Sequence, residues 1–353
     1  MRIENLETPA LYVDWDIFKS NAKLLQEYAN KIGIALRPHY KSHKCTAIAH
    51  HQVKNGAKGI TCAKLSEAED LVLSGIEDVL IANQIIEPAK AARAAYLAGC
   101  CRLTVCVDNV ENIKLLEACA TLQNTKIHCL IEYDVGMRRC GVETFDAFIS
   151  LANLINTCPH LVFEGIQAYA GNIALEKDYE KRAGTAEKVE AELRDLITYA
   201  KGKGLTIKEV SGVSTGTVFL KTKNSVYTEL QAGSYIFMDK SYADLNLEFK
   251  NSLFILTQVL SENSKHLIFD AGKKSISIDH ATPIFVKYPE KEIVFSEEHC
   301  KITKEGVTEK IGDRLSVIPG HCCTAINLHD WLYITQAGKI IDRMPINSRG
   351  KSV

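Results

Sequence analysis

Eight strand-like apolar runs alternate with helix-like stretches over the first 240 residues of this 353-residue chain. The runs are residues 34–37, 59–63, 78–82, 102–107, 127–131, 162–168, 207–211 and 229–232. Apolar side chains at helical spacing lie between them, as at 66–74, 88–98, 110–120, 145–155 and 185–202. This alternation predicts a (β/α)8 TIM barrel. The alternative is an open doubly wound sheet, which is weakened because no Gly-x-Gly-x-x-Gly follows the first strand.

The pattern changes after residue 240. Short strand-like runs such as 253–260, 266–270, 276–278, 293–295, 315–318 and 331–335 are separated by turn residues, and no long helical pattern remains. We therefore expect a second, mostly antiparallel β domain at 241–353 after a barrel at 1–240. Residues 1–13 are assigned to the barrel or, alternatively, to the β domain.

Composition excludes several classes of function. A formal net charge of −1 gives no reason to expect nucleic acid as a partner, and no apolar run is long enough to span a membrane. The first residues carry acids and lack the apolar core of a signal peptide. Twelve scattered cysteines without a Cys-x-x-Cys pair indicate reduced, packed cysteines, so we expect a cytoplasmic protein.

A basic cluster, Arg37-Pro-His-Tyr-Lys-Ser-His-Lys44, follows the first predicted strand. In a barrel, chemistry gathers at the carboxyl ends of the strands. Lys41 would therefore sit at the rim of a core, where desolvation lowers the pKa of a lysine and makes it nucleophilic. The alternative is a solvated basic loop.

Two loops of small and hydroxyl residues follow the seventh and eighth predicted strands. Thr215, Gly216 and Thr217 lie in the first loop, and Gly233, Ser234 and Tyr235 in the second. Barrels often bind phosphate there, although either loop alone could be a simple turn. A phosphate site together with Lys41 predicts a Schiff base with pyridoxal 5′-phosphate. A Schiff-base aldolase acting on a phosphorylated sugar is the rival interpretation.

Motifs over residues 8 to about 330 carry a family resemblance. They are Thr8-Pro-Ala-Leu11, the 37–44 cluster, Cys62-Ala-Lys64, Val135-Gly-Met-Arg-Arg-Cys-Gly141, Ser211–Thr217, Gln231-Ala-Gly-Ser-Tyr235, Asp270-Ala-Gly272 and Pro319-Gly-His-Cys-Cys323. In this order they resemble fold-type III pyridoxal-phosphate enzymes with an alanine racemase N-terminal-like barrel. The branch is that of D-threonine aldolase and metal-dependent D-serine dehydratase.

The resemblance implies roles for the cofactor residues. Lys41 would form the Schiff base, and Arg139 would face the pyridine nitrogen. A guanidinium keeps its proton, so it leaves the cofactor a weaker electron sink. Tyr169 would lie beside the ring or phosphate. Without the family, Arg139 reads as surface charge and Tyr169 equally well as a core tyrosine.

His321 and Cys323 match the family's His-x-Cys metal pair. Imidazole and thiolate together favour Zn²⁺, with Mn²⁺ or Mg²⁺ as alternatives. Two protein ligands leave positions open for water and a substrate hydroxyl, as a Lewis acid requires. From spacing alone, the His-Cys-Cys sequence is a weak metal signal.

We therefore expect a lyase acting on D-3-hydroxy-α-amino acids, by retro-aldol cleavage to glycine and an aldehyde. The alternative is a D-serine or D-3-hydroxyaspartate dehydratase using the same groups. Cys323 and the lack of a histidine shortly after Tyr169 favour the dehydratase, whereas segments 60–64, 165–169 and 327–331 are aldolase-like. His39, His43 and His299 are candidate bases. A non-catalytic cofactor-holding protein and a racemase are more remote alternatives, and the resemblance also implies a homodimer.

Overall fold

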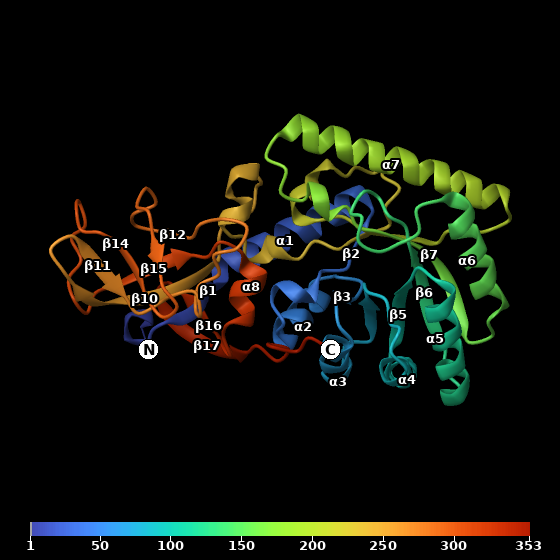
Figure 1. Cartoon of the computed structure of the whole chain (residues 1–353), viewed down its shortest axis with the longest axis horizontal. Helices are drawn as coiled ribbons and strands as arrows, with labels where there is room; N and C mark the ends of the chain where they lie inside the picture. The colour runs from blue at the N-terminus through green and yellow to red at the C-terminus, as the bar shows by residue number, and fades with distance from the viewer. Residues whose placement is uncertain (1) are drawn as a thin grey trace. The chain divides into compact units, whose positions relative to one another are not determined.

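The computed structural model describes residues 2–353, which pack into two compact units (Figure 1). The barrel unit comprises Gln26–Lys41, Ile48–Gly233 and Lys351–Val353. The β unit comprises the described residues up to Leu25 together with Ser42–Ala47 and Ser234–Gly350. The chain passes between units at Lys41–Ser42 and at Gly233–Ser234, inside two of the motifs predicted to bind cofactor. The sequence analysis placed a single domain boundary between residues 240 and 241, and that boundary stays a prediction.

The barrel unit contains a curled sheet of eight parallel strands. They are β2 (Ala35–Leu36), β3 (Ile60–Cys62), β4 (Asp78–Ile81), β5 (Arg102–Val107), β6 (Ile127–Glu132), β7 (Leu161–Ala168), β8 (Glu209–Gly212) and β9 (Glu229–Leu230). Their order is β2-β9-β8-β7-β6-β5-β4-β3. A parallel bridge between His39 and Thr61 joins the two ends of that order. The predicted TIM-like barrel is confirmed.

Helices connect the strands of the barrel unit (Figure 1). They are α2 (Thr46–Lys54), α3 (Leu65–Leu73), α4 (Pro88–Leu97), α5 (Val110–Gln123), α6 (Phe145–Thr157) and α7 (Tyr179–Gly202), and α1 (Trp15–Ile32) precedes β2. Side-chain oxygens of Asn109, Thr144 and Asp178 accept from backbone N–H groups at the starts of α5, α6 and α7. The sequence patterns did not identify α2.

A charged network fills the barrel beside the strand that leads to Lys41. The Arg37 guanidinium, 1% exposed, lies 2.9 Å from Glu229 and 2.7 Å from Asp78. Its other members are Lys58, Arg102, His128, Glu164, Lys208 and Glu209. A buried charge is costly unless paired, so this network fixes the backbone just before Lys41. Arg37 is therefore a structural member of the basic cluster.

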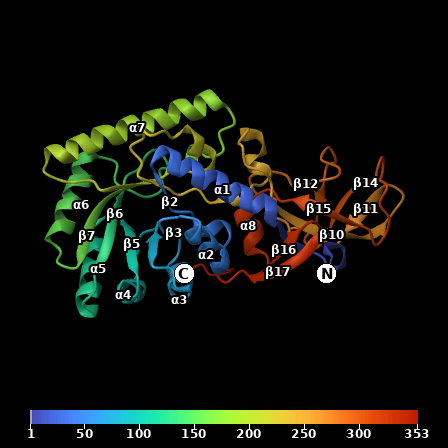
Figure 2. The same cartoon turned by 180° about the vertical axis from the view of Figure 1, so that it is seen from behind.

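The β unit is a mostly antiparallel sheet (Figure 2). Its strands are β1 (Ala10–Asp14), β10 (Leu253–Glu262), β11 (His266–Phe269), β12 (Ile284–Phe285), β13 (Val294–Phe295), β14 (Cys300–Thr303), β15 (Arg314–Ile318), β16 (Trp331–Gln336) and β17 (Lys339–Pro345). They run in the order β13-β14-β11-β10-β1-β16-β17, with β15 beside β10 and β12, and only β1 and β16 pair in parallel. The expected antiparallel sheet is confirmed.

Two local expectations for the β unit are wrong. Residues 276–278 form no strand, because the carbonyl oxygens of Ser277, Asp279 and Ala281 surround Gly320, where a Cβ atom would meet Ala281 O at 2.1 Å. The segment turns around that glycine and does not extend. A short helix, α8 (Cys322–Asn327), was also missed, since six residues carry too little periodicity to detect.

Two of the resemblance motifs meet inside the β unit. The Thr8 hydroxyl donates to one carboxylate oxygen of Asp270, and Thr257 donates to the other at 2.6 Å. Both motifs therefore support the sheet. None of the twelve cysteines, all within residues 2–353, forms a disulfide. No helix in the described part of the chain is long and apolar enough to cross a membrane.

Candidate functional site

A cavity opens at the carboxyl ends of the barrel strands, as the sequence predicts. Its lining comes from β6 and β7 and from the loops after β2, β3, β4, β6, β7 and β9. The lining residues are His39, Lys41, Ala63, Ala82, Asn83, Gln84, Glu132, Arg139, Cys140, Gln167, Tyr169 and Gln231. Three predicted site residues, Lys41, Arg139 and Tyr169, thus share one cavity.

Lys41 lies in a short 3-10 turn, Tyr40–Ser42. Its Nζ atom is 5.4 Å from the centre of the Tyr169 ring, within the range of a cation–π contact. Its backbone N–H donates to His39 Nδ1 at 3.3 Å. Gly171 lies close to the tyrosine ring, since a Cβ atom there would meet Tyr169 Cε1 at 2.6 Å. The lysine amine is therefore held against one face of an aromatic ring.

Arg139 is anchored to the cavity wall through Glu132. Its Nη2 atom lies 3.6 Å from Glu132 Oε1, and Gln84 Nε2 donates to Glu132 Oε2 at 2.5 Å. Burial raises the pKa of Glu132, although the Gln84 hydrogen bond and Arg139 oppose that rise. The buried Glu132 carboxylate therefore holds the Arg139 guanidinium at the cavity, although half of the Arg139 side chain is exposed.

The loop after β8 contains the buried hydroxyl of Thr215. Thr215 is 2% exposed, and its Oγ1 atom has no hydrogen-bond partner among residues 2–353. Ser214 and Thr217 bond to each other around the start of the 3-10 helix Thr215–Leu220. A buried hydroxyl without a partner is costly, so this donor suits an anion such as phosphate.

The six residues predicted to bind the phosphate do not all belong to one unit. Thr215, Gly216, Thr217 and Gly233 belong to the barrel unit, but they are not among the described residues that line the Lys41 cavity. Ser234 and Tyr235 belong to the β unit. In the β unit, Tyr235 is 1% exposed and its ring packs 5.7 Å from that of Phe249, and Ser234 Oγ lies 3.9 Å from Cys323 Sγ. These six residues are therefore divided between two units.

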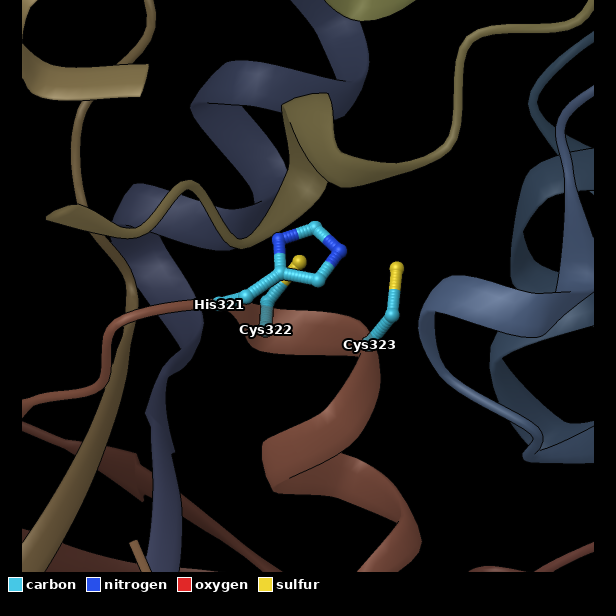
Figure 3. A group of neighbouring side chains, drawn as sticks. All are labelled: His321, Cys322 and Cys323. Atoms are coloured by element: carbon cyan, nitrogen blue, oxygen red, sulfur yellow. The ribbon is translucent and has the colours of Figure 1, made fainter. Parts of the chain in front are cut away.

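His321 and Cys323 lie at the start of α8 in the β unit (Figure 3). Figure 3 shows one ring nitrogen of His321 facing the Cys323 sulfur and the other pointing away from it. Their ligand atoms, with that of Cys322, lie within 4.8 Å of one another. A tetrahedral ion with nitrogen at about 2.0 Å and sulfur at about 2.3 Å needs these two atoms roughly 3.5 Å apart, which lies inside that limit. The pair therefore fits a single metal ion.

The electrostatics of the pair also suit a cation. Burial alone would lower the pKa of His321, but Cys323 and Asp239 outweigh it and raise the pKa to about 11. Surroundings that hold a proton this strongly are negatively charged, and negative charge also favours a bound metal cation. Burial raises the pKa of the Cys322 thiol well above its usual range, so Cys322 is a poor thiolate ligand.

Two neighbours of the pair were not identified from the sequence. Asp239 is fully buried and accepts from His321 Nδ1 at 2.9 Å. The His280 ring packs edge-to-face on that of His321, with centroids 4.9 Å apart, and its backbone has a φ of 62°. Neither residue lies in one of the resemblance motifs, and no local pattern marks either one.

The three candidate bases differ in their surroundings. His39 lines the Lys41 cavity and is buried. His43 is fully buried, and its Nδ1 bonds to the backbone of Cys45, where it stabilises a turn. His299 is exposed on the β unit. His39 is the one of the three that lines this cavity.

Comparison with known proteins identifies both parts of the chain. The family described as alanine racemase, N-terminal domain, matches residues 13–241, and the putative serine dehydratase domain matches residues 252–335. A 3-hydroxy-D-aspartate aldolase of Paracoccus denitrificans (strain Pd 1222) is 36% identical over 98% of this chain and 93% of its own length. A D-threonine aldolase of an Arthrobacter species is 35% identical over 99% and 94%.

Solved structures agree with these matches. The D-threonine aldolase of Filomicrobium marinum has a TM-score of 0.97 and 32% identity, covering 100% of this chain and 98% of that one. A D-threo-3-hydroxyaspartate dehydratase variant described as metal-free is more distant in sequence, at 23% identity with a TM-score of 0.88 over 98% of both chains, and shows the shared fold. The chain therefore belongs to the alanine racemase N-terminal-domain family, as a pyridoxal-phosphate-dependent lyase in the branch of the D-threonine and 3-hydroxyaspartate aldolases and the related dehydratases.

Proposed function

We propose that this chain cleaves D-3-hydroxy-α-amino acids between Cα and Cβ, giving glycine and an aldehyde. The observation that carries the proposal is the 36% identity to a 3-hydroxy-D-aspartate aldolase over 98% of the chain. A match of that extent includes both the barrel with Lys41 and the segment with His321 and Cys323. The substrate class is that of the aldolases similar to it, whose names specify 3-hydroxy-D-aspartate and D-threonine.

The cofactor would be held by residues of the two predicted loops and the cavity. Lys41 would bind it covalently, Arg139 would face its ring nitrogen, and Tyr169 would support its ring. Its phosphate would be bound by Thr215, Gly216, Thr217, Gly233, Ser234 and Tyr235. The buried, unpartnered Thr215 hydroxyl supports this assignment. When bound, pyridoxal phosphate supplies an electron sink for the carbon adjacent to the substrate nitrogen.

His321 and Cys323 would hold a divalent metal ion, which we propose to be Zn²⁺ because an imidazole and a thiolate are both ligands that zinc prefers. When bound, such an ion acts as a Lewis acid on a coordinated hydroxyl. With two protein ligands, such an ion would keep open positions where it could bind a substrate hydroxyl or water. The anionic surroundings that raise the pKa of His321 support the assignment.

The chain's own residues would then divide the remaining work. Tyr169 limits where the Lys41 amine can move, because Nζ lies over its ring. Arg139 keeps its proton, so it cannot transfer one to the ring nitrogen. A cofactor held in this way would be a weaker electron sink than one whose ring nitrogen is protonated. His39, buried in the cavity wall, is the candidate to exchange a proton with the substrate.

A dehydratase is the second candidate, and one observation favours it. The metal pair here is His-x-Cys, a pattern that the resemblance associates with the dehydratases. In that reaction Lys41 would remove the α-proton, and the hydroxyl would leave from Cβ. Water would then hydrolyse the released enamine to a 2-oxo acid and ammonia. Both reactions use every residue named above, so the products must decide between them.

Product analysis tests the proposal directly. The purified full chain, loaded with pyridoxal phosphate and Zn²⁺, is incubated with D-threonine, D-3-hydroxyaspartate and D-serine, with and without a metal chelator. Glycine with acetaldehyde or glyoxylate supports the aldolase. A 2-oxo acid with ammonia shows the dehydratase. Activity that is unchanged after chelation and removal of the metal would exclude the metal pair from the reaction.

We also propose that the active form is a homodimer in the cytoplasm. The twelve cysteines form no disulfide within residues 2–353, which suits a reducing compartment. Light scattering on the eluted protein gives the oligomeric state, and a monomeric mass at working concentration with full activity would exclude the dimer.

A further inference from the structure

We propose that Asp239 is the positioning residue of the metal pair. It would hold the His321 imidazole so that Nε2 faces Cys323, and its charge would increase the affinity for a divalent metal ion. The inference rests on the proposed metal function of His321 and Cys323, and it concerns a residue outside that pair. It is carried by the hydrogen bonds, the burial and the backbone geometry at Asp239.

The carboxylate of Asp239 accepts from four donors. Its Oδ2 atom accepts from His321 Nδ1 at 2.9 Å and from the Cys322 N–H at 2.7 Å. Its Oδ1 atom accepts from Ser241 Oγ at 2.5 Å and from the Tyr242 N–H at 3.3 Å. The side chain is 0% exposed, so water cannot replace any of these donors. An Asp that only capped the turn starting at Lys240 would need the Oδ1 contacts alone.

These bonds determine which imidazole nitrogen can bind a metal. Because Nδ1 donates its proton to Asp239, the lone pair of the neutral ring is on Nε2. Figure 3 shows that this second nitrogen is the one on the side of the Cys323 sulfur. Histidine ligands in metalloproteins generally donate their other ring nitrogen to a carboxylate or carbonyl, which fixes the ring and strengthens the ligand.

The local backbone supports the same placement. Met238, just before Asp239, has a φ of 53°, a left-handed conformation that costs a side chain other than glycine free energy. Backbone bonds from Lys240 N to Pro319 O and from Ser241 N to Gly320 O join this turn to the loop before His321. The strained turn therefore brings Asp239 to a histidine 82 positions away in the chain.

Charge balance indicates that the Asp239 carboxylate should increase the affinity for a divalent ion. Neutral imidazole and one thiolate leave a divalent ion with one uncompensated positive charge. The Asp239 carboxylate supplies one negative charge without occupying a coordination position. Open positions are what a Lewis acid that binds substrate needs. Removing the carboxylate should weaken metal binding without removing a ligand.

Asp279 offers a matched control. It is a second carboxylate close enough to His321 to interact electrostatically with it. Its hydrogen bonds come from Ser277 and from Thr324, not from the imidazole, and its side chain is 42% exposed. If local negative charge were the whole effect, losing either carboxylate would weaken metal binding similarly. If holding the ring matters, Asp239 should matter far more.

The test measures Zn²⁺ affinity by competition with a chromophoric chelator on the full-length chain, for wild type, Asp239→Asn and Asp279→Asn. We expect about 10–100-fold weaker binding for Asp239→Asn and a change of less than about threefold for Asp279→Asn. Cobalt replaces zinc in a second measurement, where Asp239→Asn should shift the visible ligand-field bands. Circular dichroism checks that each variant is folded.

Ser241→Ala keeps the test decisive if Asp239→Asn does not fold, because it removes one hydrogen bond from the carboxylate and leaves every charge in place. It should weaken Zn²⁺ binding measurably in a folded protein. Folded Asp239→Asn with wild-type affinity and an unchanged cobalt spectrum would overturn the inference, and so would unchanged binding by Ser241→Ala if Asp239→Asn cannot be measured. Failure of wild type to bind Zn²⁺, or undiminished binding by His321→Ala and Cys323→Ala, would instead overturn the proposed metal pair.

Discussion

Arg37 and Glu229 form an ion pair in which both side chains are 1% exposed, with Nη2 and Oε1 2.9 Å apart. Arg37 is the first residue of the cluster that contains Lys41, and Glu229 begins β9, whose next loop carries Gly233. The pair therefore ties together the strand ends that precede two predicted cofactor loops. Neither residue lines the cavity, so the pair supports the site by fixing the backbone that leads to it.

Replacing Arg37 with Met should destabilise the fold by about 3–5 kcal/mol, because Glu229 would stay buried without its main partner. Urea unfolding measures the free energy. Arg93→Met is the matched control, since the side chains of the Arg93–Glu69 pair are partly exposed, at 43% and 27%. That control should cost less than about 1 kcal/mol. Equal costs for the two variants would refute the importance of the buried pair.

The free energy of unfolding should fall in acid as the Glu229 carboxylate becomes protonated. Burial raises the pKa of Glu229, but Arg37 and Lys58 outweigh it and lower the pKa to about 2, from 4.5. The folded state therefore holds the ionised form more strongly than the unfolded state does. Its contribution is complete above pH 4.5 and is lost as the pH falls towards 2. Urea midpoints across this range should decline less steeply for Glu229→Gln than for wild type, and parallel profiles would contradict the assignment.

Lys41→Ala should abolish covalent attachment of pyridoxal phosphate. Borohydride reduction of the loaded wild-type chain should leave one cofactor per chain attached, as intact-protein mass spectrometry measures. Lys44→Ala is the control, since the Lys44 side chain bonds to the backbone of Ser348 in the β unit. It should retain the attached cofactor. If the cofactor were attached in Lys41→Ala and lost in Lys44→Ala, Lys44 would be the lysine that binds it covalently.

Gly171→Ala should weaken cofactor binding through Tyr169. The added Cβ atom would meet Tyr169 Cε1 at 2.6 Å and Met137 Sδ at 3.0 Å, so the ring under Lys41 must move. Fluorescence titration with pyridoxal phosphate should show roughly tenfold weaker binding, or about 1.4 kcal/mol. Unchanged affinity would show that the position of this ring is not critical.

Gly184→Ala provides the comparison for that substitution. Gly184 lies in α7, and nothing lies within 4 Å of the position of its added Cβ atom. Alanine there should stabilise the chain by roughly 0.5–1 kcal/mol, because glycine is a poorer helix former. Its cofactor affinity should match that of wild type.

Local sequence patterns were sufficient for much of the barrel, and together with the family motifs they identified the candidate reactive groups. Alternating apolar runs and helical periodicity specified the (β/α)8 order, because each run reflects only its own strand or helix. The same patterns placed Lys41 after the first barrel strand, and the structure puts it in one cavity with Arg139 and Tyr169. His321 and Cys323 were assigned through the family resemblance of the continuous motif at 319–323, since their spacing alone is a weak metal signal.

Only the tertiary structure revealed the residues that support these groups. Asp239 lies 82 positions from His321, and Arg37 lies 192 positions from Glu229, so no periodicity connects them. Residues 276–278 resemble a strand but turn around Gly320, a neighbour that is distant in sequence. A local pattern records how one segment meets the core, whereas a hydrogen bond between distant side chains exists only once the chain has folded. The sequence therefore determined the candidate reactive groups, and the fold decided which side chains hold them in place.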